Sequence, residues 1–478
     1  MTRFHVLPKA ALTVAIGLLL TTGHAQAQSL SQDELTRLVQ AQALKIEQLE
    51  ARLKVVEGST TSASSTTSPA PASTTPAQDA ALETRVAKIE AAQAKAPKVS
   101  WSKGAPQLSN TDGSITFRPR GRLFVDASST SGSDFADRNL SGTEIRSARL
   151  GAEGSYGRLS YAVEGDFADN EVAWKSAYVS IEHHLFGLQG DLSIGNRLND
   201  RGFDGSSSTS NTPFPDRNVV GTLIMPQRGF FGVGITERVM GNGWHASLSV
   251  AGNDLSNVGD DNDTLTVAAR AHWNPLLTKT ATVHLGAWAF REDIEAGSSG
   301  VLRSSSIAGH FNDLIKISPG SLAGPERGTG YGVEAAGFFG PSWITGEWGT
   351  RNLQGVGTAG RYDVDHDAWA ISAGLFLTGA TPAYAAKTGT WGKVKVEDPV
   401  TAGGRGAWEV RTRYEDVDYS ELPTGGTGHA WTVGANWYLN DYSRVMFDAI
   451  RWQTDNRSGA YQGEDQGYTF NTRFQVVF

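Results

Sequence analysis

The residues of this sequence that could do chemistry are arginines that recur at every second position. In FRPRGRLFVDA, Arg118, Arg120 and Arg122 share one side of an extended chain with Phe124 and Asp126. Guanidinium groups attract oxyanions through their charge and through forked hydrogen bonds. Carboxylates are interleaved at Glu153, Glu164, Asp166, Glu409 and Glu415. Because opposite charges on neighbouring strands also pair to stiffen a sheet, an anion path and a network of cross-strand ion pairs are both open interpretations.

Other reactive patterns are weak. The chain has no cysteine, which excludes disulfides, thiolate metal sites and a cysteine nucleophile. His183 and His184 lack partners at metal-ligand spacing, and the Asp260–Asp263 run lacks the glycine and distal glutamate of a helix-loop-helix calcium site. No G-x-S-x-G elbow occurs. We therefore expect no enzyme, no cofactor and no metal, and the net charge of −8 gives no sign of a nucleic-acid partner.

The elements that would position the arginines are strands, because residue types alternate with a period of two. In the last segment, YTFNTRFQVVF, aromatic and apolar residues occupy one face up to Phe478, and Arg473 and Gln475 lie on the other. GAWEVRTRYED and AWTVGANWYLN alternate in the same way. A soluble β-protein would hide its apolar face. Aromatic outer faces opposite charged ones instead indicate lipid outside and water inside.

The fold class that follows is an all-β transmembrane barrel over residues 101–478. At roughly 20–24 residues per strand and connection, with spans of about 9–11 residues, the expected number of antiparallel strands is about 16. Short turns are expected at GSYGRL and YLNDYSR, and long outside loops at SSTSGSDFADRNLSGTE and across 197–221.

The first hundred residues predict export and an appended helical segment. Residues 1–27 read as a signal peptide with Arg3 and Lys9 ahead of an apolar run and an Ala25-Gln26-Ala27 cleavage site. Residues 28–57 predict a coiled-coil helix, because apolar residues and Gln42 recur at 4-3 spacing from Leu35 to Val56. An amphipathic helix resting on the protein's own body is the alternative. A Ser/Thr/Pro linker follows over 58–78 and a short helix over 79–96.

Several segments in their order along the chain resemble the phosphate-selective porin O and P family. They are FRPRGRLFVD, RSARLGAEGSYGRLSYAVEGDFADNEVAWKSAYVSI, GAWEVRTRYEDVDYSE, TVGANWYLNDYSRVMFDAIR and NTRFQVVF. The likeness covers most of 115–478 and is patchy between 255 and 400. It implies a 16-stranded barrel, a homotrimer, and a third outside loop folded inward over about 196–220.

The resemblance also implies site residues. Its inward loop would present Asp204, Phe214 and Asp216 at the constriction. The expected pore-lining, anion-binding residues are Arg118, Arg120, Arg122, Arg146, Arg149, Lys175, Arg197, Arg201 and Arg217. Lys175 is included because WKSAYVS resembles the family's lysine-containing strand, although alternation leaves its side open.

The expected function is passive diffusion of small hydrophilic solutes, with anions such as phosphate preferred. A general or cation-tolerant porin is the first alternative, and an envelope tether that binds cell wall or a partner through the coiled coil is the second. The expected location is the outer membrane of a Gram-negative cell, with the N-terminal segment in the periplasm. Expected partners are outer-membrane lipid, two further copies of the chain, and the barrel-insertion machinery, which would recognise Phe478.

Overall fold

A computed structural model describes residues 84–85, 87–88, 97–168, 170–252, 264–298, 301–304 and 306–478. The predicted signal peptide, coiled coil and linker lie outside the described residues. Of the predicted helix over 79–96, only 84, 85, 87 and 88 are described, and they are helical.

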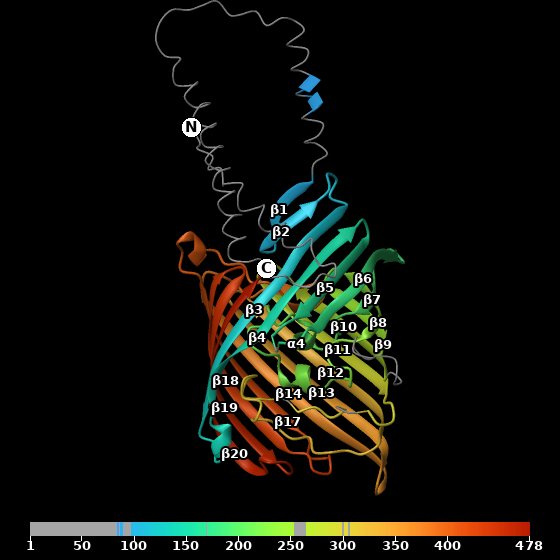
Figure 1. Ribbon diagram of the computed structural model, residues 1–478, viewed down its shortest axis with the longest axis vertical. Helices are drawn as coiled ribbons and strands as arrows, with labels where there is room; N and C mark the ends of the chain where they lie inside the picture. The colour runs from blue at the N-terminus through green and yellow to red at the C-terminus, as the bar shows by residue number, and fades with distance from the viewer. Residues whose placement is uncertain are drawn as a thin grey trace, which may run out of the picture. The chain divides into compact units, whose positions relative to one another are not determined.

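Sixteen antiparallel strands of the described chain form one closed ring (Figure 1). In chain order they are β3 (Ile115–Ser131), β4 (Ser141–Tyr156), β5 (Leu159–Asp166), β6 (Ala173–Leu185), β7 (Leu188–Asn196), β8 (Val233–Gly241), β9 (Trp244–Ala251), β10 (Leu265–Leu277), β11 (Ala281–Asp293), β12 (Pro325–Phe339), β13 (Ser342–Gly357), β14 (Gly360–Thr378), β17 (Ala407–Asp418), β18 (Thr427–Asn440), β19 (Ser443–Asn456) and β20 (Gly463–Val477). The predicted barrel of about 16 strands is confirmed.

The last strand closes the ring against the first. β20 pairs antiparallel with β3 from Tyr468 opposite Ser131 to Val477 opposite Arg122. The terminal residue continues this ladder, because Phe478 N–H donates to the Gly121 carbonyl at 2.9 Å and Gly121 N–H donates back at 2.8 Å. Closure leaves no open strand edge in the ring, so every strand has two hydrogen-bonded neighbours.

Alternation along the strands sorts side chains between an apolar outer wall and a polar interior. On β20, Tyr468 and Phe470 are 51% and 59% exposed on the outside, whereas Arg473 is 2% exposed inside. On β3, Arg118 and Phe124 face inward, as their spacing predicts. The period of two therefore assigned the faces correctly for these strands.

Two features differ from the sequence expectation. The barrel was expected to begin at residue 101, but β1 (Lys98–Ser102) and β2 (Ala105–Ser109) form a hairpin that precedes the ring and joins β3 through only two residue pairs. Strands were expected to be about 9–11 residues long, but they range from 8 residues in β5 to 19 in β14. The long strands continue past their apolar outer rows into rows of polar residues. A strand length of about 9–11 residues counts only the part of the strand that crosses the membrane.

Connections differ at the two ends of the barrel. One end, called here the turn end, carries the two-residue turns 157–158 and 441–442 where they were predicted, together with the N-terminus of β3 and Phe478. The opposite loop end carries the long connections 197–232 and 294–324. Segment 379–406 breaks this rule, because it is long although it joins β14 to β17 at the turn end. Segment 379–406 includes β15 (Tyr384–Ala385), β16 (Thr390–Trp391) and the 3-10 helix η2 (Val400–Ala402), and a second 3-10 helix, η1 (Ala136–Arg138), lies between β3 and β4.

Three connections fill part of the interior. Two apolar clusters contain the side chains that these connections bring against the wall strands. One joins Val220 and Ile307 to Trp288 and Trp452. The other joins Phe203 and Phe214 to Phe338, Trp343 and Trp391. Both clusters pack against β10–β19, so the open part of the interior lies along β3–β7.

Candidate functional site

The segment that narrows the barrel is 197–232, between β7 and β8. It contains α4 (Phe203–Ser206) and α5 (Val219–Leu223), two helices of about one turn. Asn218 caps α5, since its side chain accepts a hydrogen bond from Gly221 N–H at 2.8 Å. Arg201 donates to the carbonyls of Gly221 and Ile224 at 2.8 and 2.6 Å, at the carboxyl end of the same helix. Short helices need such partners, because their own hydrogen bonds cannot stabilise them.

Carboxylates of the opposite wall hold this segment across the barrel. Glu347 on β13 accepts hydrogen bonds from the N–H of Phe203 and from the Asn218 side chain. Glu415 on β17 accepts from Val219 N–H at 2.8 Å. These buried acids therefore satisfy orphan backbone donors of α4 and α5.

Two predicted constriction residues anchor the segment by their side chains. Phe214 is 3% exposed and lies between the guanidinium groups of Arg411 and Arg413, at 4.6 and 4.3 Å from its ring centre. Asp204, in α4, accepts from the Trp391 indole N–H at 2.9 Å and from Asn218 N–H at 3.0 Å. Both side chains are buried, so they position the constriction without facing the open cavities described below.

The third predicted constriction residue, Asp216, lies at the edge of the open path. Its carboxylate is 3.2 Å from Arg146 on β4 and 3.7 Å from Arg473 on β20. Burial raises the pKa of Asp216, but the charges of Arg473 and Arg146 outweigh it and hold the pKa well below its ordinary value. Asp216 is therefore ionised, and it neutralises part of the positive charge at this point.

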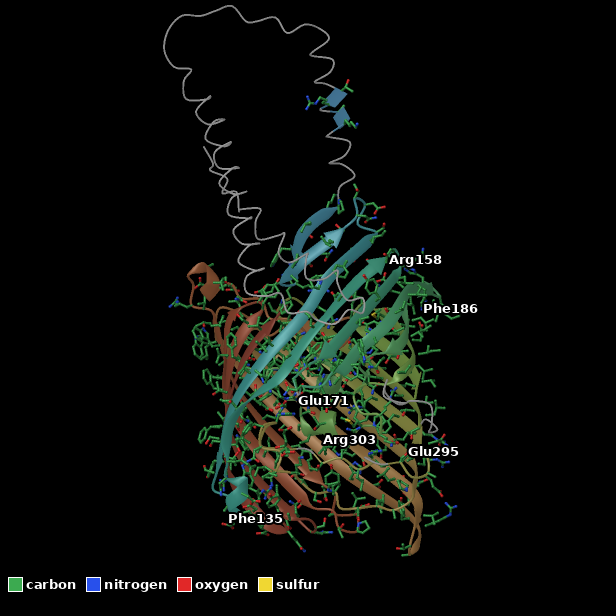
Figure 2. All side chains as sticks on the ribbon, viewed as in Figure 1. Phe135, Arg158, Glu171, Phe186, Glu295 and Arg303 are labelled. Atoms are coloured by element: carbon green, nitrogen blue, oxygen red, sulfur yellow. The ribbon has the colours of Figure 1, made fainter. Side chains whose placement is uncertain are left out.

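A cavity of about 730 Å³ opens toward the loop end beside segment 197–232. Ten of the residues that line it are basic and two, Glu164 and Asp166, are acidic. The basic ones are Arg120, Arg122, Arg146, Arg149, Lys175, Arg197, Arg217, Arg228, Arg303 and Arg473 (Figure 2 labels Arg303). An enclosed space with this balance of charge has a strongly positive potential.

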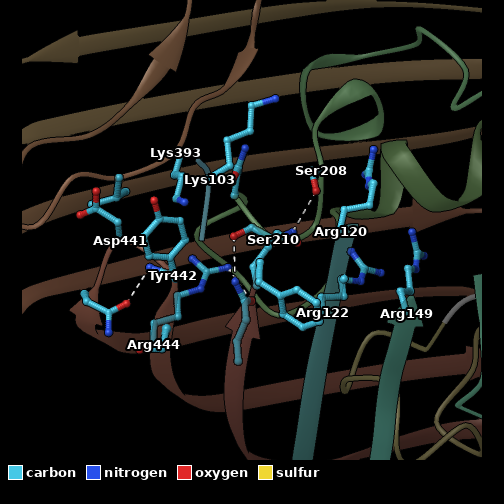
Figure 3. Close-up of a pocket in the computed structure, with 18 of the residues that line it drawn as sticks. Lys103, Arg120, Arg122, Arg149, Ser208, Ser210, Lys393, Asp441, Tyr442 and Arg444 are labelled. Atoms are coloured by element: carbon cyan, nitrogen blue, oxygen red, sulfur yellow. Dashed lines mark hydrogen bonds between the residues drawn. The ribbon is translucent and has the colours of Figure 1, made fainter. Parts of the chain in front are cut away.

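A second cavity, of about 290 Å³, lies toward the turn end (Figure 3). Its basic residues come from several elements: Lys103 from the β1–β2 turn, Arg118 and Arg120 from β3, Lys393 from segment 379–406, and Arg444 from β19. The two cavities share the lining residues Arg120, Arg122, Arg149, Glu164 and Ser208. The arginines of β3 and β4 therefore lie at the junction of the two cavities.

Some of the arginines are neutralised by carboxylates. Arg118 and Arg120 contact Glu153 at 2.6 and 3.1 Å, and Arg149 contacts Glu164 at 3.2 Å and Asp166 at 2.9 Å. These contacts are cross-strand ion pairs, one of the two interpretations that the interleaved acids left open. The network of ion pairs is therefore real for this part of β3–β5.

Five other basic groups of the loop-side cavity have no carboxylate within 4.0 Å among the described residues: Arg122, Lys175, Arg217, Arg228 and Arg303. Arg122 donates to the hydroxyls of Ser147 and Thr209 at 3.0 and 2.8 Å. Arg217 donates to the carbonyls of Asp204 and Ser207 at 3.0 and 2.6 Å. A neutral acceptor does not cancel the charge of a guanidinium, so these groups contribute to the positive field of the cavity.

Burial lowers the pKa of two arginines of segment 197–232, but both remain protonated. Burial lowers the pKa of Arg217 and of Arg228 to about 10. Both pKa values lie above neutral pH, so both guanidinium groups stay cationic near pH 7.

Most residues that were predicted to line the pore line one or both of the two cavities. Arg118 lines the turn-side cavity, Arg120, Arg122 and Arg149 line both cavities, and Arg146, Lys175, Arg197 and Arg217 line the loop-side one. Lys175 reaches the interior because the register between β5 and β6 shifts there, with Glu164 opposite Ser176 and Gly165 opposite Trp174. Arg201 was predicted to line the pore but lines neither cavity. Its side chain is 3% exposed and donates a hydrogen bond to the Ile224 carbonyl at the end of α5.

Sequence reasoning missed six basic residues of the cavities: Lys103, Arg228, Arg303, Lys393, Arg444 and Arg473. Strand parity could have found Arg444 and Arg473, because both lie on the polar faces of alternating segments. The other four lie in turns and loops, where no period links a residue to a face.

Segment 379–406 is the other element that sequence reasoning missed. Arg270 on β10 donates to the carbonyls of Thr388 and Gly389 at 2.9 and 2.5 Å. Tyr384 meets His284 of β11 at 2.8 Å. Trp391 N–H donates to the Ser207 hydroxyl at 2.9 Å. Segment 379–406 therefore links the wall to α4 and occupies the interior along β10–β14.

The described residues contain no group of three or more histidine, aspartate or glutamate side chains placed to hold a metal ion. They also contain no helix that is long and apolar enough to cross a membrane.

Known proteins resemble the chain over a third to nine tenths of its length. A Caulobacter vibrioides protein is 27% identical over 463 residues, which are 92% of this chain and 89% of that protein. Porin O of Pseudomonas aeruginosa is 28% identical over 158 residues, 31% of this chain and 35% of Porin O. Among solved structures, an anion-selective porin from Comamonas acidovorans has a TM-score of 0.47 at 12% identity, covering 76% of this chain and all of that one.

The model of the family described as phosphate-selective porin O and P matches residues 117–478, which include all but the first two residues of the closed ring. The resemblance noted on individual segments is thereby confirmed. The chain belongs to the phosphate-selective porin O and P family and is an outer-membrane porin.

Proposed function

We propose that the protein is a passive channel for small anions, with inorganic phosphate among its solutes. The observation that carries the proposal is the set of five basic groups without a carboxylate partner in the loop-side cavity. Rings of unpaired arginine and lysine favour anions by field strength and by hydrogen bonding to oxyanions. No covalent step and no energy source are part of the proposal.

The proposed path begins in the loop-side cavity, where Lys175, Arg217, Arg228 and Arg303 concentrate anions. It continues past Arg122 at the junction, where carboxylates on Arg120 and Arg149 reduce the charge. Weaker binding there would let the ion leave, since conduction needs sites that are favourable but not tight. The turn-side cavity, with Lys103, Lys393 and Arg444, completes the path.

We further propose that three copies assemble, that the turn end and residues 28–96 face the periplasm, and that Phe478 is read by the insertion machinery. The outward aromatic face of β20 that ends at Phe478 supports the last point. The 4-3 spacing between Leu35 and Val56 supports an assembly of identical chains. Cross-linking of the full chain, compared with a chain that lacks residues 28–96, tests the trimer and the role of this segment separately.

The decisive experiment is single-channel recording of the purified protein in planar bilayers. The reversal potential across a KCl gradient should have the sign of chloride preference, and millimolar phosphate should block part of the chloride current. A cation-selective reversal potential would instead support the general porin alternative. Chloride preference without phosphate block would keep the anion channel and reject phosphate as its solute.

A further inference from the structure

Three buried histidines meet where segment 379–406 lies against the wall, and none of them is among the residues that line the two cavities. They are His245 on β9, His272 on β10 and His284 on β11. His245 and His272 contact each other through their Nδ1 atoms, and the rings of His272 and His284 stack with their centres 5.1 Å apart. Because buried polar atoms need partners, the groups that each ring nitrogen faces decide where its protons lie.

The outer nitrogens of the pair formed by His245 and His272 both have to donate a hydrogen bond. His245 Nε2 lies 2.8 Å from a carboxylate oxygen of Asp200, in segment 197–232. His272 Nε2 lies 3.0 Å from the carbonyl oxygen of Ala386, in the stretch that fills the barrel. Carboxylates and carbonyls only accept hydrogen bonds, so each Nε2 atom carries a proton.

The contact between the two Nδ1 atoms needs a third proton. One Nδ1 must donate to the other, because two bare lone pairs in contact would repel each other. A neutral imidazole carries one proton and an imidazolium carries two. Three protons on two rings therefore leave one positive charge, which His245 and His272 share. This charge is the condition under which all three bonds of the chain from Asp200 to Ala386 exist together.

His284 needs no additional proton. Its Nε2 donates to Glu334 on β12 at 3.2 Å, and its Nδ1 accepts from the Tyr384 hydroxyl at 2.8 Å. A neutral imidazole with one donor and one acceptor makes both bonds. Lys387, the cation of the same stretch, donates instead to Gln189 on β7 at 3.2 Å. The bond between Tyr384 and the wall is therefore independent of the shared proton.

The other charged groups around the pair come from segment 197–232 and from β8, β10 and β12. Asp200 lies 3.4 Å from Arg238 and 2.9 Å from Arg270, and Glu334 lies 2.7 Å from Arg270. Burial raises the pKa of Asp200, but the charges of Arg238 and Arg270 outweigh burial and hold this pKa well below its ordinary value. The charges of these two carboxylates and two arginines add to zero, so the shared proton gives the cluster its net charge.

We propose that the proton shared by His245 and His272 is a pH-dependent latch that holds segment 379–406 against the wall. When this proton is lost, one of the three contacts sets two lone pairs against each other. The bond to the Asp200 carboxylate is the strongest, because charge-assisted hydrogen bonds are about twice as strong as neutral ones. The loss therefore falls on His272 and breaks its bond to Ala386.

The sign of the effect follows from the direction of the proton transfer. The pair is protonated at low pH, so the latch is closed there and opens as pH rises through the titration of the pair. Arg270 donates to the carbonyls of Thr388 and Gly389 in both states, and Tyr384 keeps its bond to His284. Loss of the latch therefore loosens the segment and does not expel it from the barrel.

Hydrogen exchange of the full-length protein in detergent, read by mass spectrometry, tests the latch. The two conditions are about pH 5.5 and about pH 8.5, on either side of the ordinary histidine pKa of about 6.5. After correction for intrinsic exchange rates, protection over 383–392 should be about tenfold lower at the higher pH, because a hydrogen bond to a charged group is lost. Protection of β18 and β19, which contribute no residue to the cluster, should be equal at both.

The double variant H245Q/H272Q removes both titrating rings. Its protection over 383–392 should be equal at the two pH values, whatever its absolute level. Equal protection at both pH values in wild-type protein would overturn the proposal. A pH-dependent loss of protection in H245Q/H272Q as large as that in wild-type protein would overturn it as well.

Two further variants serve as matched controls. His183→Gln replaces another histidine that contacts a carboxylate, Glu237 at 2.9 Å, and should keep the wild-type pH dependence. Tyr384→Phe removes a bond that involves no titrating proton, so it should lower protection over 383–392 at both pH values and leave the difference between them. Disappearance of the pH dependence in His183→Gln would assign the titrating group to that site and overturn the latch.

The consequence for the ion current rests on the proposed channel function. Because the remaining bonds hold the loosened segment, single-channel records in KCl should show brief, more frequent openings to a higher level at the higher pH, and H245Q/H272Q should show no such change. A transition frequency that ignores pH while protection falls would overturn this effect on the current. Cation preference in the same records would contradict the proposed function and leave the exchange result as it is.

Discussion

Along β3–β7 the interior of the barrel is open and lined by arginines, whereas along β10–β18 it is filled by folded chain. Both sides are rich in buried arginine. On the filled side, Arg270 contacts Asp200 at 2.9 Å and Glu334 at 2.7 Å, and Arg351 contacts Glu292. On the open side, the side chains of Arg122 and Arg217 donate hydrogen bonds to hydroxyls and carbonyls among the described residues, and each guanidinium group lies over a phenylalanine ring. The same residue type is therefore structural where a carboxylate neutralises it, and under the proposed function it acts on solutes where no described carboxylate contacts it.

The filled side also explains how the open side keeps its shape. Segment 379–406 lies against β10 and β11, and its Trp391 holds α4 through Ser207 and Asp204. α4 belongs to segment 197–232, which narrows the open path. The filled side thus sets the position of the constriction, and the open side supplies part of its charge through Arg122 and Lys175.

The largest expected effect comes from emptying the filled side. Residues 380–405 can be replaced by a short Gly/Ser turn, because β14 and β17 are paired up to Thr378 and Trp408 and the ends of the segment lie close together. Conductance in 1 M KCl should rise at least twofold and anion preference should fall, because wide pores select weakly. A folded variant with unchanged single-channel conductance would contradict the assignment of this segment as a plug.

The second effect comes from removing charge on the open side. The double variant R122Q/K175Q eliminates two cations without carboxylate partners and should weaken phosphate block of chloride current by about 10- to 100-fold, from about 1.5–3 kcal/mol for a hydrogen bond to a charged group. Titration of phosphate in bilayer recordings measures the strength of the block. Arg351→Gln is not a suitable control, because it would leave Glu292 buried and unpaired. The control is Arg451→Gln on the outer wall, which should leave the phosphate block unchanged.

The third change should strengthen the phosphate block, whereas the second weakens it. Asp216→Asn removes the carboxylate that faces Arg146 and Arg473, so it should strengthen phosphate block about threefold at neutral pH. Because the pKa of Asp216 lies well below its ordinary value, wild-type behaviour should be independent of this group between pH 5 and 8. The same bilayer titration applies, and a weaker block in Asp216→Asn would show that Asp216 acts by holding the loop and not by neutralising charge.

The smallest effect concerns the turn end. Burial, together with repulsion from Arg118 and Lys103, lowers the pKa of Lys393 to about 8. Lysine is charged below its pKa, so Lys393 loses its charge as pH rises from 7 to 9, and anion preference should decrease slightly over that range. The reversal potential measured at each pH records the change. Lys393→Gln should show the high-pH value throughout, and an identical pH dependence in that variant would remove Lys393 from the explanation.

The period of two was sufficient to predict much of the barrel. Arg118, Arg120 and Arg122 were placed inside by their spacing, and Phe470 and Phe474 outside, because a strand has no other way to distribute its side chains. The number of strands followed from chain length, since each span and its connection need a nearly fixed number of residues. The family resemblance added an inward loop over about 196–220, which spacing could not have identified, and the structure extends this segment to 197–232.

The sequence could not predict which charges are paired. Arg201 and Arg217 lie in the same segment and were both expected to line the pore, yet Arg201 turns to the end of α5 and only Arg217 faces the cavity. Segment 379–406 likewise gave no periodic signal for its inward course. The course of segment 379–406 depends on contacts between residues more than a hundred positions apart, such as Arg270 with Gly389. Arg201 is held by the carbonyls of Gly221 and Ile224, which come together only when α5 folds back on it.

The sequence by itself therefore determined a β-barrel with an apolar outer wall and arginines on the inner face, because alternation and closure are local and repetitive properties of the chain. Only the tertiary structure decided where the path runs and which cations line it without a partner. The physical reason is that a side chain's charge is compensated or left free by its neighbours in space, and inside a barrel those neighbours come from loops that no local period describes.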